Sequence, residues 1–209
     1  MGLRPGGPPR GGRPGDRRLA GLSGVLFVRH ASTPGMRAAC FPAPGEEADA
    51  ASLTRAAALT RTAAGAVVWA APSVAARQTV AALGLAARVV PALAEVDCGR
   101  WRGLPYERVA REEPDELASW LTDPHAAPHG GESLAAHAER VAAWLESVRA
   151  EPGVVAVCDA GAIRAALGHA LGLDPLSAAR FDLAPLSVTE LTVTRAGWRV
   201  AHVNRKVLF

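Results

Sequence analysis

The sequence is poor in lysine, in aromatic residues and in long apolar runs, and each shortage argues against a class of protein. Lys206 is the only lysine, so the basic residues are nearly all arginine, and the net charge is only +3. The body of the chain has no basic stripe with interleaved aromatic residues, so we expect no nucleic-acid partner. No apolar run approaches the roughly 20 residues that span a bilayer, so we expect no membrane partner.

Cysteine is also scarce. Cys40, Cys98 and Cys158 are odd in number and far apart, which indicates neither a disulfide framework nor a metal site of paired cysteines. A reducing, cytoplasmic location is the simplest that fits this usage.

The length of 209 residues predicts one domain, and the 49% hydrophobic content is ample for its core. Residues 1–22 are rich in glycine, proline and arginine and lack the apolar segment of a secretory signal. This composition cannot form a core. We therefore predict a disordered tail over residues 1–22 and a folded domain over residues 23–209.

Apolar and amphipathic segments alternate along that domain. Short apolar runs at 25–28, 66–70, 87–90 and 154–157 predict strands, and the segments at about 52–64, 73–83, 134–148 and 160–171 predict helices. Residues 186–193 and 198–203 predict an antiparallel pair. Residues 34–51 read as a loop, and residues 93–131, with a polar helix interrupted at Pro114, as an insertion that covers the active end. The alternation favours an α/β fold with three α/β/α layers and a mostly parallel central sheet.

The first predicted strand ends on Arg29 and His30, just before the turn residues Pro34 and Gly35. Ligands of α/β sheets bind outside the carboxyl ends of the strands. His30 there could act as a nucleophile or as an acid or base, and Arg29 could hold an anion with its fork of donors. A strand followed by an ordinary basic turn is the alternative interpretation of this pair alone.

Several later segments fit the same pattern, and together they resemble the histidine phosphatase superfamily over roughly residues 24–204. The resemblance implies that His30 attacks phosphorus and carries the phosphoryl group, with Arg29 and Thr33 as phosphate ligands. Glu95 matches the acid that protonates the leaving oxygen. Residues Gly130-Gly131-Glu132-Ser133 match the Gly-Glu-Ser that opens a helix, and Asn204 resembles an asparagine after the closing strand. The resemblance implies no organic cofactor and no metal.

The sequence departs from the family pattern at two positions. Ala75 stands where the family has a phosphate-binding arginine. Arg77 lies two residues on, about 200° around a helix, and should point away. Asp159 stands where the family has its second histidine, so we place Asp159 among the catalytic residues with His30 and Glu95.

These departures remove positive charge from the expected pocket and add a carboxylate. Two charges at about 4 Å interact by roughly 4 kcal/mol at an effective dielectric constant near 20, so we expect phosphomonoesterase activity to be weak or absent. A proton on Asp159 beside a bound phosphate would soften this effect. Arg37 and His129 are further candidate phosphate ligands, with solvated loop positions as the alternative, and we expect His137 to be an ordinary helix residue.

These residues are compatible with three functions. The first is hydrolysis of a small phosphorylated metabolite through a phosphohistidine at His30. The second is acid–base chemistry by His30, Glu95 and Asp159 on a non-phosphate substrate, and the third is a non-catalytic, ligand-binding relative. In each case the partner is a small molecule, which in the first case is phosphorylated or anionic. The sequence is also compatible with a homodimer.

Overall fold

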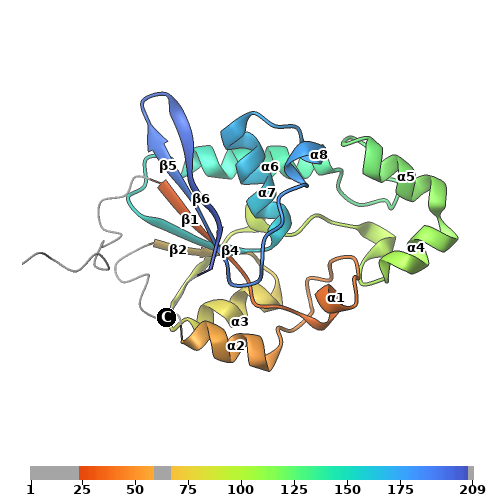
Figure 1. Ribbon diagram of the computed structural model, residues 1–209, viewed down its shortest axis with the longest axis horizontal. Helices are drawn as coiled ribbons and strands as arrows, with labels where there is room; N and C mark the ends of the chain where they lie inside the picture. Colours follow the sequence, from red (N-terminus) through yellow and green to blue (C-terminus); the bar gives the residue numbers. More distant parts are fainter. Residues whose placement is uncertain (1–23, 59–66, 207–209) are drawn as a thin grey trace, which may run out of the picture.

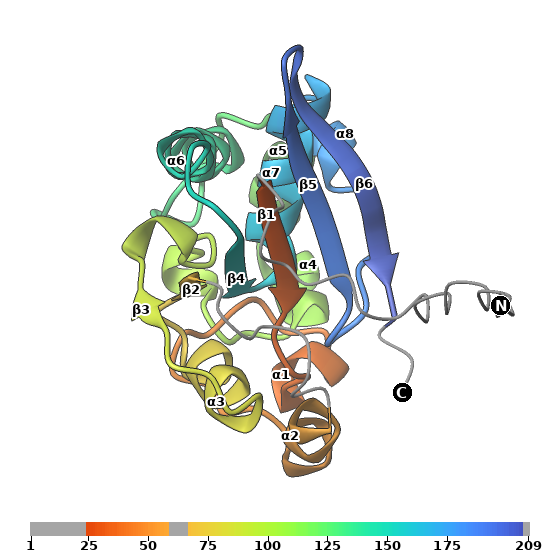
Figure 2. The same cartoon turned by 90° about the vertical axis from the view of Figure 1, so that its left-hand side faces the viewer.

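The two apolar runs that predict buried strands form the centre of a six-stranded sheet. In the computed structural model, which describes residues 24–58 and 67–206, they are β1 (Gly24–Arg29) and β4 (Val154–Cys158). The strand order is β3-β2-β4-β1-β5-β6 (Figure 2). The predicted tail at 1–22 and the predicted helix end near residue 64 lie outside the described residues.

The first four strands of the chain pair in parallel, and the last two join the sheet through antiparallel pairings. β1 pairs with β4 in parallel, so that Arg29 lies opposite Cys158, and β2 (Val67–Ala70) continues the parallel set to β3 (Arg88–Val89). β5 (Val188–Thr194) and β6 (Gly197–Arg205) form the predicted antiparallel pair. All five residues of β4 are buried, as expected for a strand that is covered on both faces.

Helices cover both faces of the sheet, which confirms the predicted layers (Figure 1). On one side lie α2 (Ala50–Ala57) and α3 (Val74–Ala82), and on the other α6 (Leu134–Ser147), α7 (Ala160–Leu171) and the short α8 (Pro175–Ala178). Helices α3 and α6 begin within one residue of their predicted starts, and each follows a serine N-cap. The Ser73 and Ser133 hydroxyls accept hydrogen bonds from the backbone N–H groups three residues on.

The segment predicted as a loop at 34–51 contains more helix than expected. A one-turn helix, α1 (Pro34–Arg37), follows β1, because Thr33 Oγ1 accepts from the Met36 N–H and Pro34 suits the first helical position. Helix α2 begins at Ala50, two residues earlier than the predicted start, with Asp49 as its N-cap residue.

The insertion at 93–131 folds around a second hydrophobic cluster of its own, made by Phe41, Cys98, Trp101, Val109 and Leu117. Two short 3₁₀ helices, Pro91–Leu93 and Gly99–Trp101, lead into α4 (Tyr106–Glu112) and α5 (Pro114–Thr122). The break between α4 and α5 falls at Pro114, as predicted, because proline cannot continue the hydrogen-bond ladder. Figure 1 shows α4 and α5 set apart from the sheet at one end of the molecule.

Candidate active site

A cavity of about 710 Å³ opens at the carboxyl ends of β1 and β4. Because these strands are parallel neighbours, the residues that follow them meet at one edge of the sheet, and the backbone N–H of His30 donates to the Cys158 carbonyl at 2.9 Å. Arg29, His30, Thr33, Glu95 and Asp159, all predicted site residues, line this cavity. The volume lies within the range of pockets that hold small molecules.

His30 is held in one orientation by the backbone. Its ring is 3% exposed, and Nδ1 lies 2.8 Å from the Ala31 carbonyl oxygen. A carbonyl can only accept, so Nδ1 carries the proton and the neutral ring keeps its lone pair on Nε2. Nε2 faces Glu95 Oε1 at 3.4 Å. The arrangement presents an unprotonated nitrogen beside a carboxyl group.

His30 and Glu95 each affect the pKa of the other. Burial opposes a charge on His30, but the hydrogen bonds to Glu95 and to the Ala31 carbonyl and the nearby carboxylates raise its pKa above the ordinary value. Burial also raises the pKa of Glu95, against the opposing effect of His30 and with the help of the Asp159 charge. When the proton of this pair lies on Glu95, the neutral His30 can act as a nucleophile and Glu95 as a general acid.

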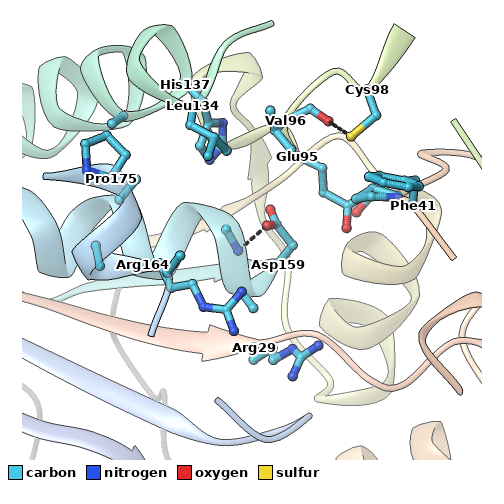
Figure 3. A pocket seen from close by; sticks show the side chains of 18 of the residues that line it. Arg29, Phe41, Glu95, Val96, Cys98, Leu134, His137, Asp159, Arg164 and Pro175 are labelled. Atoms are coloured by element: carbon cyan, nitrogen blue, oxygen red, sulfur yellow. Dashed lines mark hydrogen bonds between the residues drawn. The ribbon is translucent and has the colours of Figure 1, made fainter. Parts of the chain in front are cut away.

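Two guanidinium groups supply positive charge to the cavity, and the second was not among the predicted site residues. Arg29 donates to the Leu183 carbonyl, and Arg164 Nε donates to the Phe181 carbonyl at 2.8 Å. Burial and the charge of Arg164 lower the pKa of Arg29, which indicates that the two groups lie close together. Figure 3 shows both side chains beside Asp159. Each keeps further N–H donors for an anion.

Helical spacing could have revealed Arg164. Gly161, Arg164, Ala165 and Gly168 all line the cavity, and they recur at three- and four-residue intervals on one face of α7. Ala75 lines the cavity, whereas Arg77 is exposed and lies outside it, as its position two residues further along the helix predicted.

Asp159 has a structural role as well as a place in the cavity. It is the N-cap residue of α7, where Oδ1 accepts from the N–H groups of Gly161 at 2.5 Å and Ala162 at 3.1 Å. These two hydrogen bonds fix one carboxylate oxygen of Asp159. The other, Oδ2, is buried and has no hydrogen-bond partner among the described residues.

Two predicted phosphate ligands do not reach the cavity. Arg37 ends α1 with an exposed side chain that pairs with Asp49. His129 is buried against the aromatic rings of Trp101 and Trp120 in the insertion. Neither residue lines the cavity. Thr33 does, although its hydroxyl also caps α1.

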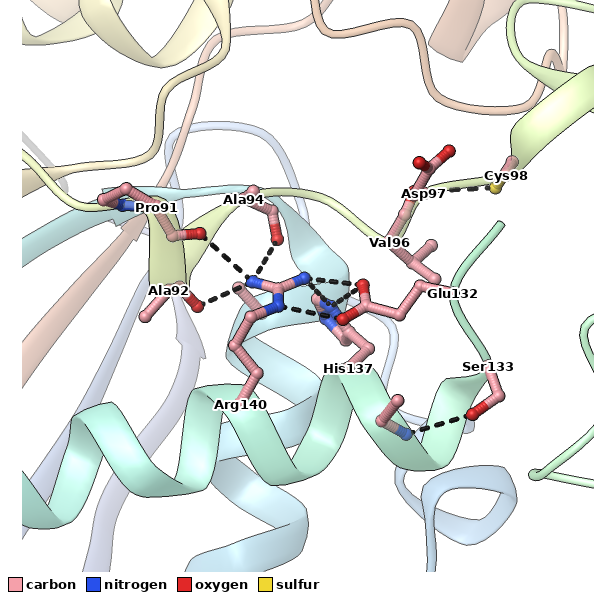
Figure 4. Close-up of polar contacts among 12 residues, drawn as sticks. Pro91, Ala92, Ala94, Val96, Asp97, Cys98, Glu132, Ser133, His137 and Arg140 are labelled. Atoms are coloured by element: carbon pink, nitrogen blue, oxygen red, sulfur yellow. Dashed lines mark hydrogen bonds and ion pairs between the residues drawn. The ribbon is translucent and has the colours of Figure 1, made fainter. Parts of the chain in front are cut away.

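The partly buried Arg140 side chain anchors the segment that carries Glu95 to α6 (Figure 4). Arg140 donates to both Glu132 oxygens, at 2.9 and 2.7 Å, and a third nitrogen donates to the carbonyls that precede Glu95, those of Pro91, Ala92 and Ala94. Arg140 also donates to Nδ1 of His137 at 2.9 Å. His137 lines the cavity and is 4% exposed, so it is more than the ordinary helix residue expected.

The cysteines of the site region are poor nucleophiles. Burial, together with nearby carboxylates, raises the pKa of Cys98 to about 12 and that of Cys158 well above its ordinary value. Within residues 24–58 and 67–206, no group of three or more His, Cys, Asp or Glu side chains could hold a metal ion. In the same ranges no helix is long and apolar enough to cross a membrane.

Such a pocket is typical of α/β proteins that bind an anionic group at the carboxyl edge of a mostly parallel sheet. A family model described as histidine phosphatase superfamily, branch 1, matches residues 25–206. The chain therefore belongs to this superfamily.

Several known proteins are similar to this chain in sequence or in fold. Phosphoserine phosphatase 1 of Hydrogenobacter thermophilus is 37% identical over 84 residues, which make up 38% of this chain and 40% of that protein. A mycobacterial glucosyl-3-phosphoglycerate phosphatase shares the fold with a TM-score of 0.75 at 23% identity, over 88% of this chain and 99% of that chain. A phosphoserine phosphatase mutant of Entamoeba histolytica, in complex with phosphoserine, gives 0.77 at 16% identity, over 87% and 96%.

Proposed function

We propose that this protein hydrolyses phosphomonoesters of small metabolites through a phosphohistidine at His30. The observation that carries the proposal is the orientation of His30, whose Nδ1 is bonded to the Ala31 carbonyl and whose Nε2 faces Glu95 Oε1 at 3.4 Å. The superfamily and the relatives that are phosphatases support it. Phosphoserine and phosphoglycerate derivatives, named for those relatives, are the first substrates to test.

In the first step, His30 Nε2 attacks phosphorus in line with the ester oxygen. The N–P bond forms as the P–O bond breaks, and the leaving oxygen takes the proton of Glu95. Arg29 and Arg164 offer N–H donors to the phosphoryl oxygens, where negative charge builds up. Both groups are already fixed by backbone carbonyls, so little rearrangement is needed.

In the second step, a water molecule replaces the imidazole on phosphorus. Glu95, now ionised, takes a proton from the water as its oxygen attacks, and the P–N bond breaks. Inorganic phosphate leaves, and His30 and Glu95 return to their first protonation states. The same carboxyl group thus serves as acid and then as base.

A second candidate function is ligand binding without turnover. Ala75 and Asp159 favour it, because they remove an arginine and a histidine that the family pocket is expected to have and add a carboxylate. The same residues favour acid–base chemistry on a non-phosphate substrate. The three functions differ in what they require of His30.

The test is turnover and labelling of the full chain. We would assay p-nitrophenyl phosphate, phosphoserine and other small phosphomonoesters, and would trap the enzyme during turnover to locate a phosphoryl group by mass spectrometry. We expect His30→Ala to abolish both turnover and labelling. His202→Ala, an exposed histidine on β6, should change neither.

Three other results would reject hydrolysis at His30. Turnover that persists in His30→Ala would place the chemistry elsewhere. Phosphoester binding that is equal in wild type and His30→Ala, without turnover, would favour the binding function. If the protein does not turn over phosphoesters but turns over another class of compound in a His30-dependent way, the acid–base function is favoured.

A further inference from the structure

One oxygen of Asp159 needs a hydrogen-bond donor that the described part of the protein does not supply. Asp159 is 7% exposed and lines the cavity, and its Oδ1 is occupied by the first turn of α7. Oδ2 is buried and has no partner among the described residues. Buried acceptors are almost always paired, because leaving one unpaired is unfavourable. A ligand in the cavity is the natural source of the missing donor.

Titratable groups from several elements line the cavity, and Glu46, Glu139 and His169 are among them. The charge of Asp159 acts on Arg29 and His30 at the end of β1 and on Glu95 after β3. His137 of α6 and Arg164 of α7 also line the cavity (Figure 3). The two arginines are directed to backbone carbonyls. His30 and Glu95 face each other. None of these groups makes a hydrogen bond to Oδ2 in the described structure.

His137 contributes a donor to the same space. Arginine can only donate, so the 2.9 Å bond from Arg140 makes Nδ1 of His137 an acceptor and leaves the proton of the neutral ring on Nε2. Glu132 Oε2 lies 3.6 Å from Nδ1, too far for a hydrogen bond. Nε2 is buried without a partner among the described residues.

Gly161 keeps the space between these two side chains open. A Cβ atom on Gly161 would lie 2.7 Å from Asp159 Oδ1 and 3.5 Å from His137 Nε2. Figure 3 shows His137 and Asp159 on the same side of the cavity. The pocket therefore combines several cationic or N–H donors with one buried acceptor, and a bound anion has to satisfy both.

A phosphoryl group that carries one proton can satisfy both. Its P–OH donates to Asp159 Oδ2, while its other oxygens accept from the arginines and from His137. A fully ionised oxyanion such as sulfate has no proton to donate and meets like charge. Like charges about 4 Å apart in a partly buried site weaken binding by several orders of magnitude.

We propose that Asp159 makes this pocket select the singly protonated form of a phosphoryl group and reject fully ionised oxyanions. The proposal rests on the proposed phosphoryl site at His30. The complex holds one proton between Oδ2 and a phosphoryl oxygen, and the phosphoryl group supplies that proton. The substrate class is thereby narrowed to phosphomonoesters bound as monoanions.

Calorimetric titration of the full chain with inorganic phosphate and with sulfate tests this selection without any need for turnover. Between about pH 5.5 and 8.5 we expect sulfate to bind at least about 100-fold more weakly than phosphate. Inorganic phosphate still carries one proton as a dianion, so its association constant should vary by less than about tenfold over this range. The association constant for methylphosphonate, titrated in the same way, should fall about tenfold for each pH unit above its second pKa, because its dianion has no proton to donate and binding then takes up a proton.

Asp159→Asn is the informative variant, because asparagine is also a good N-cap residue and its amide can donate to an ionised oxygen. We expect it to bind sulfate and phosphate within about tenfold of each other and to lose the dependence on pH. Asp174→Asn is the matched control. Asp174 caps α8 in the same way, but it is exposed and lies outside the cavity, so its variant should behave as wild type does.

The proposal is overturned if wild type binds sulfate about as tightly as phosphate, or binds neither. It is also overturned if Asp159→Asn keeps the preference and the pH dependence of wild type. Turnover is measured separately. Selective phosphate binding without turnover or labelled His30 would refute hydrolysis alone, and turnover that sulfate inhibits as strongly as phosphate would refute the selection alone.

Discussion

Replacing Glu132 by glutamine removes the charge that holds Arg140 between α6 and the segment carrying Glu95. Burial alone would raise the pKa of Glu132, but His137 and the hydrogen bonds from Arg140 lower it from an ordinary 4.5 to about 2. At about 1.4 kcal/mol for each unit of pKa, this difference corresponds to about 3 kcal/mol of stability. The side chain is only 19% exposed, so solvent screens the pair little.

The stabilisation has a definite dependence on pH. Because the folded protein lowers the pKa of Glu132, the contribution is complete above about pH 4.5 and is lost as pH falls toward about 2, with about half remaining near pH 3. At pH 7 we expect Glu132→Gln to lower the free energy of unfolding by about 2–3 kcal/mol and Tm by roughly 5–10 °C. Near pH 3 the difference from wild type should be about half as large.

Urea unfolding followed by circular dichroism at both pH values measures this effect. Glu112→Gln is the control, because Glu112 pairs with Arg108 on the surface and both side chains are about half exposed. It should leave the free energy of unfolding close to that of wild type, because solvent screens an exposed ion pair. The reasoning is refuted if the two variants lose equal stability at pH 7, or if the loss in Glu132→Gln is the same at both pH values.

Three further predictions concern catalysis. Glu95→Gln should lower kcat for alkyl phosphates by about 10²–10⁴-fold, and by less for p-nitrophenyl phosphate, whose leaving group scarcely needs a proton. Its rate should also lose the decline at high pH, which in wild type reports loss of the Glu95 proton; the decline at low pH, which reports protonation of His30, should remain. Arg164→Gln should raise KM by about 10- to 100-fold, because a charged hydrogen bond to phosphate is lost. Ala75→Arg combined with Asp159→His should raise kcat/KM on phosphomonoesters in steady-state assays.

Each of these predictions has a clear contrary result. Equal losses of Glu95→Gln on both kinds of substrate would show that Glu95 does not protonate the leaving group. An unchanged KM in Arg164→Gln would remove that guanidinium from the substrate site. Lower activity in the doubly substituted protein would show that Asp159 has a working role in hydrolysis and that the expected weakness of this pocket is wrong.

Helical spacing and strand position anticipated part of the site. The apolar runs before Arg29 and before Asp159 predicted two buried strands, and parallel pairing then brings the residues at their ends together. The 3.6-residue period predicted that Arg77 would point away from the pocket, and it is exposed. These inferences succeeded because they depend only on the regular geometry of strands and helices.

Residues whose direction depends on packing were harder to place. Arg37 and His129 were expected near the phosphate, but α1 turns Arg37 outward to Asp49, and aromatic rings of the insertion enclose His129. His137 was expected to be an ordinary helix residue. It enters the cavity because Arg140, on the same helix, orients its ring while bonding to the segment before Glu95.

The sequence by itself determined the layered α/β fold, the central strands and the meeting of Arg29, His30 and Asp159, since hydrophobic period and strand ends are local properties of the chain. The tertiary structure alone decided that His137 joins them and that Oδ2 of Asp159 lacks a partner among the described residues. These features depend on how α6 and α7 pack against each other and on the rotamers that this packing imposes, and no local pattern encodes such distances.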